Sequence, residues 1–291
     1  MSSSPDRPST DPPPSTDPSP EPVSAIGRTP MSQIDAMPNG TTRSTTVTDR
    51  VHLVQGPSVN WIIVEGDLGP VLIDTGYPGD GAAVTATLGA LGYAVEDVQA
   101  ILLTHGHSDH IGNATFIAGL AECDILASRD EIPNVRREVL EQVGLADVQP
   151  HLERPGVAAW VSHAVEAGGL EVVPPTSVTA IEDVPELRAT LGVAVRPLPL
   201  PGHTRGHLGF LLVEHGVLVA GDALVTAHPT SPHGGPQLLP EMFHGDLQRA
   251  RQSLTTLAGL PASVVLPGHG PAFFGSPAQA AAEALAFGSA F

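Results

Sequence analysis

Residues 104–113, T-H-G-H-S-D-H-I-G-N, constrain this chain more than any other stretch. They directly follow an apolar run at residues 98–103 that predicts a buried strand. Imidazole and carboxylate side chains together suit zinc, iron or manganese, and the absence of thiolates argues against a closed structural zinc site. The sequence therefore predicts a metal centre on a turn at a strand end. Its four candidate ligands are His105, His107, Asp109 and His110.

Three further candidate ligands follow along the chain, each after an apolar run and beside a glycine. They are His203 in P-G-H-T, Asp222 in A-G-D and His269 in P-G-H-G. A glycine at a strand end lets the backbone bend toward a shared cleft. Any one of these motifs alone is typical of an ordinary turn. Together with the histidine cluster, they predict a site where four strand ends meet.

Alternating strand and helix patterns are predicted over most of the chain, which implies sheets with helices packed outside them. Asp80 is a candidate N-cap for the first helix. Strands are expected over residues 47–54, 59–65, 70–73, 98–103, 124–128, 193–200, 208–214, 216–220 and 263–266. Helices are expected over residues 80–91, 110–120, 129–143, 157–167, 246–257 and 277–286.

The composition divides the chain into a tail and one domain. Residues 1–45 are rich in Pro, Ser and Asp, so they cannot bury enough apolar surface to offset their ordering entropy. We expect a disordered tail there, with a docking or phosphorylation segment as the alternative. Residues 46–291 are expected to form one domain in which residues 129–176 are a helical cap insertion over the site.

Charge and hydropathy limit the classes of partner. The formal net charge is −18 and all 13 basic residues are Arg, so the surface should repel phosphate backbones and anionic membranes. We therefore expect neither nucleic acid nor membrane as a partner; the oligomeric state stays open. The N-terminus has no basic start followed by an apolar run, which predicts no signal peptide and a cytoplasmic location. The single Cys123 permits no intrachain disulfide.

The ligand motifs in chain order, preceded by L-I-D-T-G at residues 72–76, resemble the metallo-β-lactamase superfamily. The resemblance covers about residues 47–275. It implies an α/β fold, a four-layer αβ/βα sandwich in which two mixed β-sheets have helices outside and the metals lie at one edge. It also implies a dinuclear ligand set like that of the glyoxalase II enzymes, which hydrolyse glutathione thioesters.

The resemblance also implies a role for each candidate residue. His105, His107 and His203 would bind one metal, and Asp109, His110 and His269 would bind the second, with Asp222 between them. The expected cofactor is two Zn²⁺, with iron or manganese possible. Asp74 resembles a carboxylate that orients a ligand histidine through its free ring N–H. His207 either supports the ligands in the same way or is a polar turn residue.

The expected activity is hydrolysis of an ester, thioester or lactone in a small acyl substrate by a hydroxide shared between two metals. Asp109 is the expected catalytic residue, which would orient the nucleophile or carry its proton. Asp222 argues against a true β-lactamase, because the enzymes of that group lack the bridging carboxylate. The alternative is a mononuclear iron persulfide dioxygenase that uses His105, His203 and Asp222.

Two specific hydrolase identities fit the sequence less well. No Arg follows Arg251 to bind glutathione, and the only tyrosines, Tyr77 and Tyr93, precede the cluster, whereas acyl-homoserine lactonases have a tyrosine beyond it. The loop at residues 223–245 contains no Arg, so we expect a neutral or weakly anionic substrate. Substrate contact stays open for three histidines of this loop, which are His228, His233 and His244.

Overall fold

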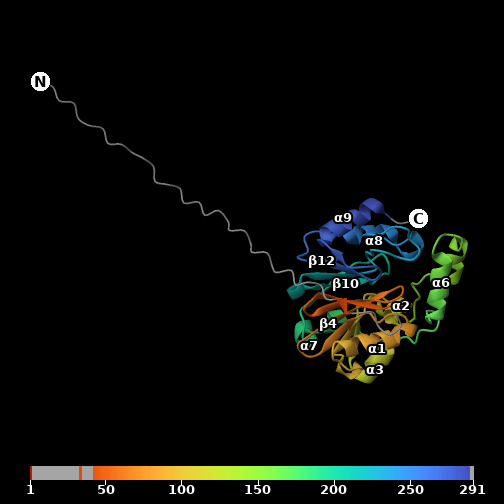
Figure 1. The fold of residues 1–291 in the computed structure, drawn as a ribbon, viewed down its shortest axis with the longest axis horizontal. Helices are drawn as coiled ribbons and strands as arrows, with labels where there is room; N and C mark the ends of the chain where they lie inside the picture. The colour runs from red at the N-terminus through yellow and green to blue at the C-terminus, as the bar shows by residue number, and fades with distance from the viewer. Residues whose placement is uncertain (2–32, 35–41, 289–291) are drawn as a thin grey trace. The chain divides into compact units, whose positions relative to one another are not determined.

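Two β-sheets lie face to face in the computed structural model, which describes Met1, residues 33–34 and residues 42–288 (Figure 1). Helices cover the outer face of each sheet, which confirms the predicted four-layer α/β sandwich. The tail expected at residues 1–45 lies almost entirely outside the described residues. Strand pairing begins before the expected domain boundary at residue 46, because β1 (Gln33–Ile34) pairs with β2 (Arg43–Thr48).

The first sheet is mixed and has the strand order β1 to β8. Its strands are antiparallel as far as β5 and parallel from β5 to β8. After β2, the strands are β3 (Val51–Gln55), β4 (Asn60–Glu65), β5 (Pro70–Ile73), β6 (Ala100–Leu102), β7 (Asp124–Ala127) and β8 (Thr179–Ala180).

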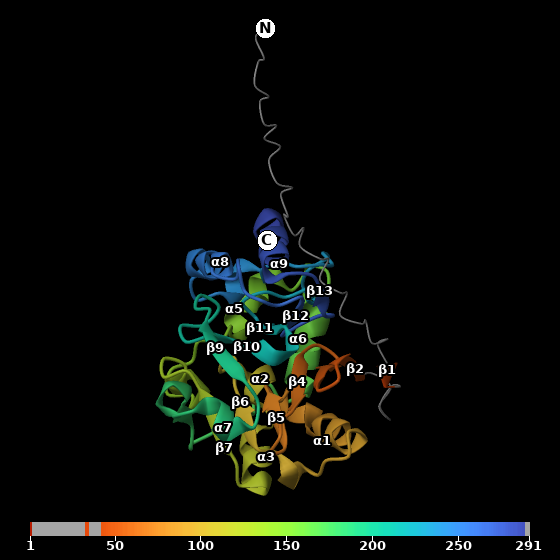
Figure 2. The same ribbon diagram turned by 90° about the vertical axis from the view of Figure 1, so that its left-hand side faces the viewer.

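The second sheet has the order β13-β12-β11-β10-β9 and is also mixed, because β11 and β12 run parallel. Its strands are β9 (Val195–Pro199), β10 (Leu208–Leu212), β11 (Val217–Gly221), β12 (Val264–Pro267) and β13 (Phe273–Phe274). Figure 2 shows these strands stacked over β4 to β7, with α8 (Leu247–Thr255) and α9 (Pro277–Phe287) on the far side.

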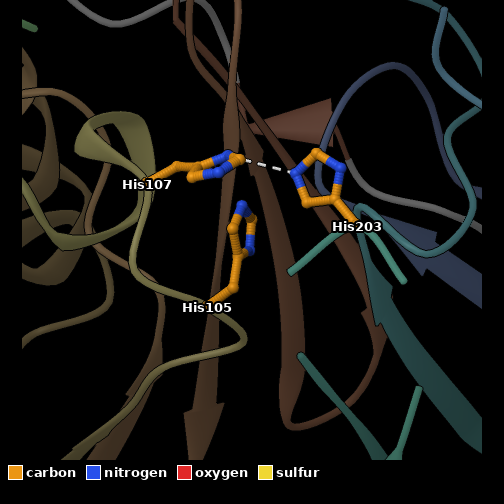
Figure 3. A group of neighbouring side chains, drawn as sticks. All are labelled: His105, His107 and His203. Atoms are coloured by element: carbon orange, nitrogen blue, oxygen red, sulfur yellow. Dashed lines mark hydrogen bonds between the residues drawn. The ribbon is translucent and has the colours of Figure 1, made fainter. Parts of the chain in front are cut away.

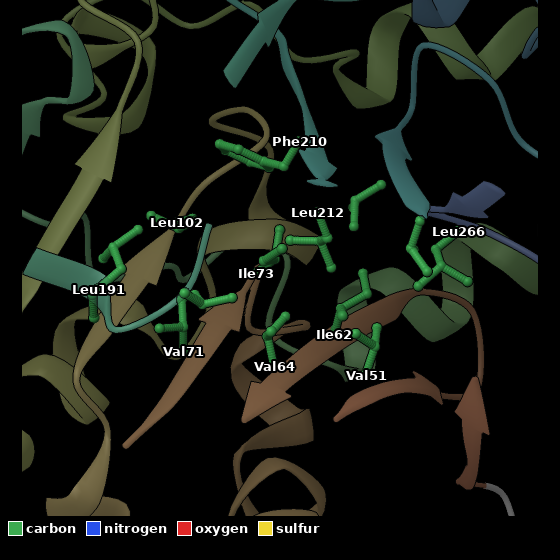
Figure 4. Packing of buried hydrophobic residues seen from close by; sticks show 14 of the residues in the cluster. Val51, Ile62, Val64, Val71, Ile73, Leu102, Leu191, Phe210, Leu212 and Leu266 are labelled. Carbon is green, nitrogen blue, oxygen red and sulfur yellow. The ribbon is translucent and has the colours of Figure 1, made fainter. Parts of the chain in front are cut away.

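The side-chain alternation of β4 explains the layers. Ile62 and Val64 point between the sheets, where they join residues such as Phe210 of the second sheet (Figure 4). Trp61 and Ile63 point the other way, against α1 (Gly81–Ala90) and α3 (Ala114–Ala121). All four side chains are buried, as expected for a strand covered on both faces. Truncating one of them to alanine should cost about 2–5 kcal/mol of unfolding free energy.

The remaining helices are short, apart from α6, which lies at one edge of the sandwich (Figure 1). In the part of the chain that the structure describes, no helix is both long and apolar enough to cross a bilayer. The remaining α-helices and 3₁₀-helices (labelled η) are η1 (Pro78–Asp80), η2 (Val95–Asp97), α2 (Ser108–Ile111), α4 (Ile132–Val135), α5 (Leu145–Val148), η3 (Gln149–His151), α6 (Val157–Glu166), η4 (Ile181–Asp183), α7 (Leu187–Leu191), η5 (Val213–His215) and η6 (Glu241–Phe243).

Three predicted elements were wrong in extent. Residues 47–54 are divided between β2 and β3 by a turn. The helix expected over residues 110–120 is interrupted at Gly112, whose N–H donates to Gly76 O at 2.9 Å. The helix expected over residues 129–143 is limited to α4, because Arg137 adopts a left-handed backbone conformation (φ 59°) that ends it.

Candidate metal centre

Seven predicted ligands come together at the ends of strands from both sheets. The cluster at residues 105–110 follows β6 of the first sheet and continues into α2. In the second sheet, His203 lies between β9 and β10, Asp222 follows β11 and His269 follows β12. Figure 3 shows the rings of His105, His107 and His203 converging.

The ligand atoms form two triads, and Asp222 lies between them. His105, His107 and His203 form one group, and Asp109, His110 and His269 form another, each with its candidate ligand atoms within 4.8 Å of one another. A third group of the same kind joins Asp222 to His105 and His110. Asp222 contacts both triads, since its Oδ2 lies 3.5 Å from His203 Nε2 and 3.1 Å from His269 Nε2.

In four of these histidines, the ring nitrogen that faces away from the centre (the outer nitrogen) donates a hydrogen bond, and the other ring nitrogen (the inner nitrogen) faces the centre. Each bond places the ring hydrogen on the outer nitrogen, so the inner nitrogen keeps its lone pair for a cation. The four bonds are His105 Nδ1 to Thr104 Oγ1 (3.0 Å), His107 Nε2 to Glu141 O (2.5 Å), His110 Nδ1 to Asp74 Oδ2 (2.9 Å) and His269 Nδ1 to Ser58 O (2.5 Å).

Several inner atoms have no hydrogen-bond partner among the described residues, although all are buried. They are His105 Nε2, His110 Nε2 and Asp222 Oδ1. The inner nitrogens of His107 and His203 face each other at 3.1 Å (Figure 3). Buried polar atoms are normally satisfied, and cations placed among these atoms would satisfy them together. The residues therefore fit divalent metal ions.

The charges around the site favour the same conclusion. Burial holds the pKa of His105 and of His203 well below the ordinary range, so both rings are neutral, as a metal ligand must be. Burial alone would also lower the pKa of His110, but the nearby charges of Asp109 and Asp222 raise it well above the ordinary value. The carboxylates thus attract positive charge to the centre.

Asp74 and His207 contact the candidate ligands from outside. Asp74, in a left-handed conformation (φ 61°) just after β5, accepts hydrogen bonds from Thr104 N at 2.8 Å and Thr104 Oγ1 at 2.7 Å, besides the one from His110. The contact with a ligand histidine expected for Asp74 is thus present. His207 is fully buried, and its Nε2 accepts the backbone N–H of Asp222 at 3.0 Å. The side chain of His207 therefore fixes the backbone that carries Asp222.

Glu131 is a site residue that sequence reasoning missed. It is buried just before α4, and its carboxylate accepts four hydrogen bonds. Two reach Oε1 and two reach Oε2, so the side chain joins the turn of the cluster to the turn that follows His203. The donors are Gly106 N (2.8 Å), Asn134 Nδ2 (2.7 Å), Thr204 Oγ1 (2.8 Å) and Gly206 N (2.9 Å). No local sequence pattern marks this residue, because three of its four donors lie far away in sequence.

An apolar cavity of about 650 Å³, including space open to solvent, adjoins the metal centre. Its walls come from α6, from residues 142–148 and from the loop after Asp222. No Arg lies among the described residues that line it. Besides the candidate ligands His107, His203 and His269, the aromatic lining residues are Tyr77, Trp160, His228 and Phe243. Of these, Tyr77 was not predicted as a site residue, although its place directly after the L-I-D-T-G motif offered a signal.

The histidines of the loop after Asp222 have different positions. His228 lines the cavity. His244 lies beside His203, with ring centroids 5.5 Å apart, and burial lowers its pKa to about 4. His233 instead stacks on Phe287 of α9, at 3.8 Å between ring centroids, and is not among the residues that line the cavity.

A more polar groove lies beside the cavity and shares Gln142, Val143 and Phe243 with it. Its cationic side chains are Arg205 and Arg249, but acidic residues outnumber them. Arg205 pairs with Glu141, with 3.5 Å between Nε and Oε1. The acidic lining residues are Asp130, Glu141, Asp147, Glu182 and Asp246. The groove is therefore a poor receptor for a highly charged anion.

The fold and the His/Asp ligand groups define a metal-dependent hydrolase. Residues 54–269 match the metallo-beta-lactamase superfamily, and the chain belongs to this family, as its motifs predicted. It is 30% identical to the probable metallo-hydrolase YflN of Bacillus subtilis, over 69% of this chain and 75% of that protein. It is 28% identical to a hydroxyacylglutathione hydrolase of Thiobacillus denitrificans, over 63% of this chain and 50% of that enzyme.

Solved structures agree with this assignment. The metallo-beta-lactamase family protein TTHA1429 from Thermus thermophilus aligns with a TM-score of 0.59 and 27% identity, over 83% of this chain and 80% of that one. A di-iron-bound form of TTHA1623 aligns with a TM-score of 0.50 and 27% identity, over 74% and 89% of the two chains.

Proposed function

We propose that this protein is a dinuclear hydrolase that cleaves an ester, thioester or lactone of a small, mainly apolar acyl compound. One observation carries the proposal: two complete ligand triads, joined by Asp222, open on an apolar cavity without arginine. Small-molecule sites are commonly apolar pockets with few polar groups, which is the character of this cavity.

The residues that would hold two cations follow from the triads. His105, His107 and His203 would hold one cation, Asp109, His110 and His269 the other, and Asp222 would reach both. When bound, two divalent cations supply hydroxide at neutral pH by lowering the pKa of water, and they polarise the acyl oxygen. Zinc suits these nitrogen and oxygen ligands, and iron or manganese would also be accepted.

Asp109 is the carboxylate best placed to move a proton. Its side chain is 14% exposed, against 2% for Asp222, and it lines the cavity. Its Oδ2 lies 3.5 Å from His269 Nε2. Asp109 can therefore orient the attacking group and pass a proton to the leaving group, while Asp222 stays fixed between the triads.

The mononuclear dioxygenase alternative needs only His105, His203 and Asp222. This alternative would leave the triad of Asp109, His110 and His269 without a cation to bind. Yet His110 and His269 are buried, and the outer nitrogen of each is hydrogen-bonded as in a metal ligand. The second triad therefore supports two cations. The iron in the similar TTHA1623 structure belongs to that protein, so the metal of this protein has to be identified by measurement.

The test combines metal content with a substrate panel. Protein purified without added metal should contain about two metal equivalents, measured by inductively coupled plasma mass spectrometry. The panel compares kcat/KM for aryl esters, lactones, a glutathione thioester and bis-aryl phosphodiesters. We expect a neutral ester or lactone to react fastest. A tenfold lead for the phosphodiester or the glutathione thioester would overturn the substrate class, and a persulfide-dependent uptake of oxygen would overturn the reaction type.

A further inference from the structure

We propose that His228 is a catalytic residue that donates a hydrogen bond from its Nε2–H to the acyl oxygen of the substrate. This inference rests on the proposed hydrolase function and names a protein group that acts beside the cations. It assigns a role to a histidine that is neither a candidate ligand nor a contact of one through hydrogen bonding.

The position of His228 meets the first requirement, which is access to the reacting group. The side chain lines the apolar cavity, and its ring lies 4.9 Å from the ring of His269, at 86°. Phe243 and Trp160 flank the same ring, with centroids 5.3 Å and 5.7 Å away. His228 is only 6% exposed, so these contacts hold the ring beside the metal centre.

The hydrogen bonds of Nδ1 decide which nitrogen carries the hydrogen. The backbone N–H of Thr230 donates to His228 Nδ1 at 3.3 Å, and Thr230 Oγ1 lies 2.7 Å from the same atom. A backbone N–H can only donate, so Nδ1 must have its lone pair free to accept. This bond favours the neutral tautomer with its hydrogen on Nε2, in which Thr230 Oγ1 also donates to Nδ1.

The structure shows no hydrogen-bond partner for the donor on Nε2 among the described residues, and this atom is not among the fully buried polar atoms without a partner, so it reaches the space of the cavity. Two other polar residues of the cavity wall satisfy each other, because Gln142 Nε2 donates to Ser108 Oγ at 3.1 Å and Gln142 Oε1 accepts the Ser108 N–H at 3.0 Å. A donor that reaches the cavity is free to bond to an acceptor on a bound substrate.

Hydrolysis supplies such an acceptor at the moment of reaction. When hydroxide bonds to the acyl carbon, the C=O π electrons move to the acyl oxygen. They return when the bond to the leaving group breaks and that group takes up the hydroxide proton. A fixed, neutral donor aimed at this oxygen stabilises the charge as it develops, which is typically worth about 10²- to 10³-fold in kcat.

A purely structural reading is that His228 fills space between Trp160 and Phe243. Two variants separate the readings. His228→Phe keeps an aromatic ring of similar size but removes the donor, whereas His228→Gln keeps an N–H donor near the position of Nε2 and loses the ring. His215→Phe is a matched control, because His215 lies in η5, at the end of β11 remote from Asp222.

The experiment measures kcat and KM for an aryl ester with each metal-loaded variant, together with metal content and melting temperature. We expect His228→Phe to lose at least about a hundredfold in kcat, with KM within a few-fold, metal content unchanged and a wild-type melting temperature. His228→Gln should stay within about tenfold of wild type, and His215→Phe should match it. Equal losses in both His228 variants would overturn the inference, as would wild-type kcat in His228→Phe.

A second readout does not depend on activity. Long-range ¹H–¹⁵N spectra of the metal-loaded protein should show, among the histidines with an unprotonated Nδ1 and a protonated Nε2, one set of signals that disappears in His228→Gln. A protonated Nδ1 at this residue would refute the assignment. If the wild type cleaves no acyl compound, the proposed function fails while this spectrum still reports the tautomer. If the wild type is active and His228→Phe is equally active, only the role of His228 fails.

Discussion

The carboxylate of Glu131 accepts a hydrogen bond from the backbone N–H of Gly106, and the two atoms lie 2.8 Å apart. Gly106 separates two candidate ligands, so this bond fixes the turn on which both lie. The other carboxylate oxygen accepts a hydrogen bond from Gly206 N at 2.9 Å, in the turn that follows His203. One buried side chain thus sets the spacing between ligands from the two sheets.

Glu131→Gln should weaken metal binding without removing a ligand. All four partners of Glu131 are donors, and the NH₂ of glutamine would face at least one of them. An unpaired buried donor costs about 1–3 kcal/mol, and loss of a group that supports metal ligands typically costs about 10- to 100-fold in affinity. Thermal melting and competition with a chelator measure the two effects. Glu138→Gln, in the same segment but exposed, should change neither.

Gly268→Ala should disrupt the centre through steric contact alone. A Cβ at this position would lie 2.0 Å from Asp222 Oδ1 and 3.0 Å from His110 Cε1, so both side chains would have to move. We expect loss of at least one metal equivalent and most of the activity, measured by metal analysis and ester hydrolysis. In the control Gly89→Ala, the new methyl group meets nothing within 4 Å in α1, and stability should rise by about 0.5–1 kcal/mol. Full metal content in Gly268→Ala would show that the turn can relax.

Asp222→Ala should lose about one of two metal equivalents and at least about a hundredfold in activity, because its carboxylate contacts both triads. The fold should survive, since the change removes charge at a cleft and not apolar packing. Circular dichroism and metal analysis test these two statements. Asp124→Ala, at the exposed start of β7, is the control. Two bound metals with wild-type turnover in Asp222→Ala would exclude the dinuclear proposal.

Cys123 should react slowly with thiol reagents in the folded protein. Burial, with a smaller contribution from the charge of Asp124, raises the pKa of its thiol to about 11. At pH 8, only ~0.1% of the thiol is then ionised, against roughly a quarter in an unfolded chain. Labelling with a maleimide at pH 8 should therefore be about a hundredfold slower in buffer than in denaturant. It should accelerate as the pH rises toward 11, and equal rates in the two solvents would show that the thiol is not protected.

Much of the centre could be predicted from sequence because its ligands lie in short motifs at strand ends. The spacing within residues 105–110 places several donors on one turn, and glycine marks the other three ligand positions. The alternation of strand and helix patterns predicted sheets with helices outside, and the resemblance to the metallo-β-lactamase superfamily implied the two-sheet sandwich. In the structure, β4 connects these layers, with Ile62 facing one side and Trp61 the other.

What could not be predicted depends on contacts between distant parts of the chain. Glu131 could not be predicted as a site residue, since nothing local reveals that its partners include residues 106, 204 and 206. Tyr77 was considered only as a residue preceding the cluster, although the folded chain brings it to the cavity wall. The helix expected over residues 129–143 failed because the left-handed Arg137 cannot be read from composition.

The division of ligands between the two sheets has a consequence for biosynthesis. The cluster at residues 105–110 is made early, whereas Asp222 and His269 follow strands from the later part of the chain. During translation, neither triad can be complete until the second sheet has docked on the first, because each triad draws one histidine from it. Tight cation uptake is therefore a late event that follows assembly of the sandwich. A nascent chain that stops before β12 lacks His269, so one triad stays incomplete in it and tight metal binding has to wait for that strand.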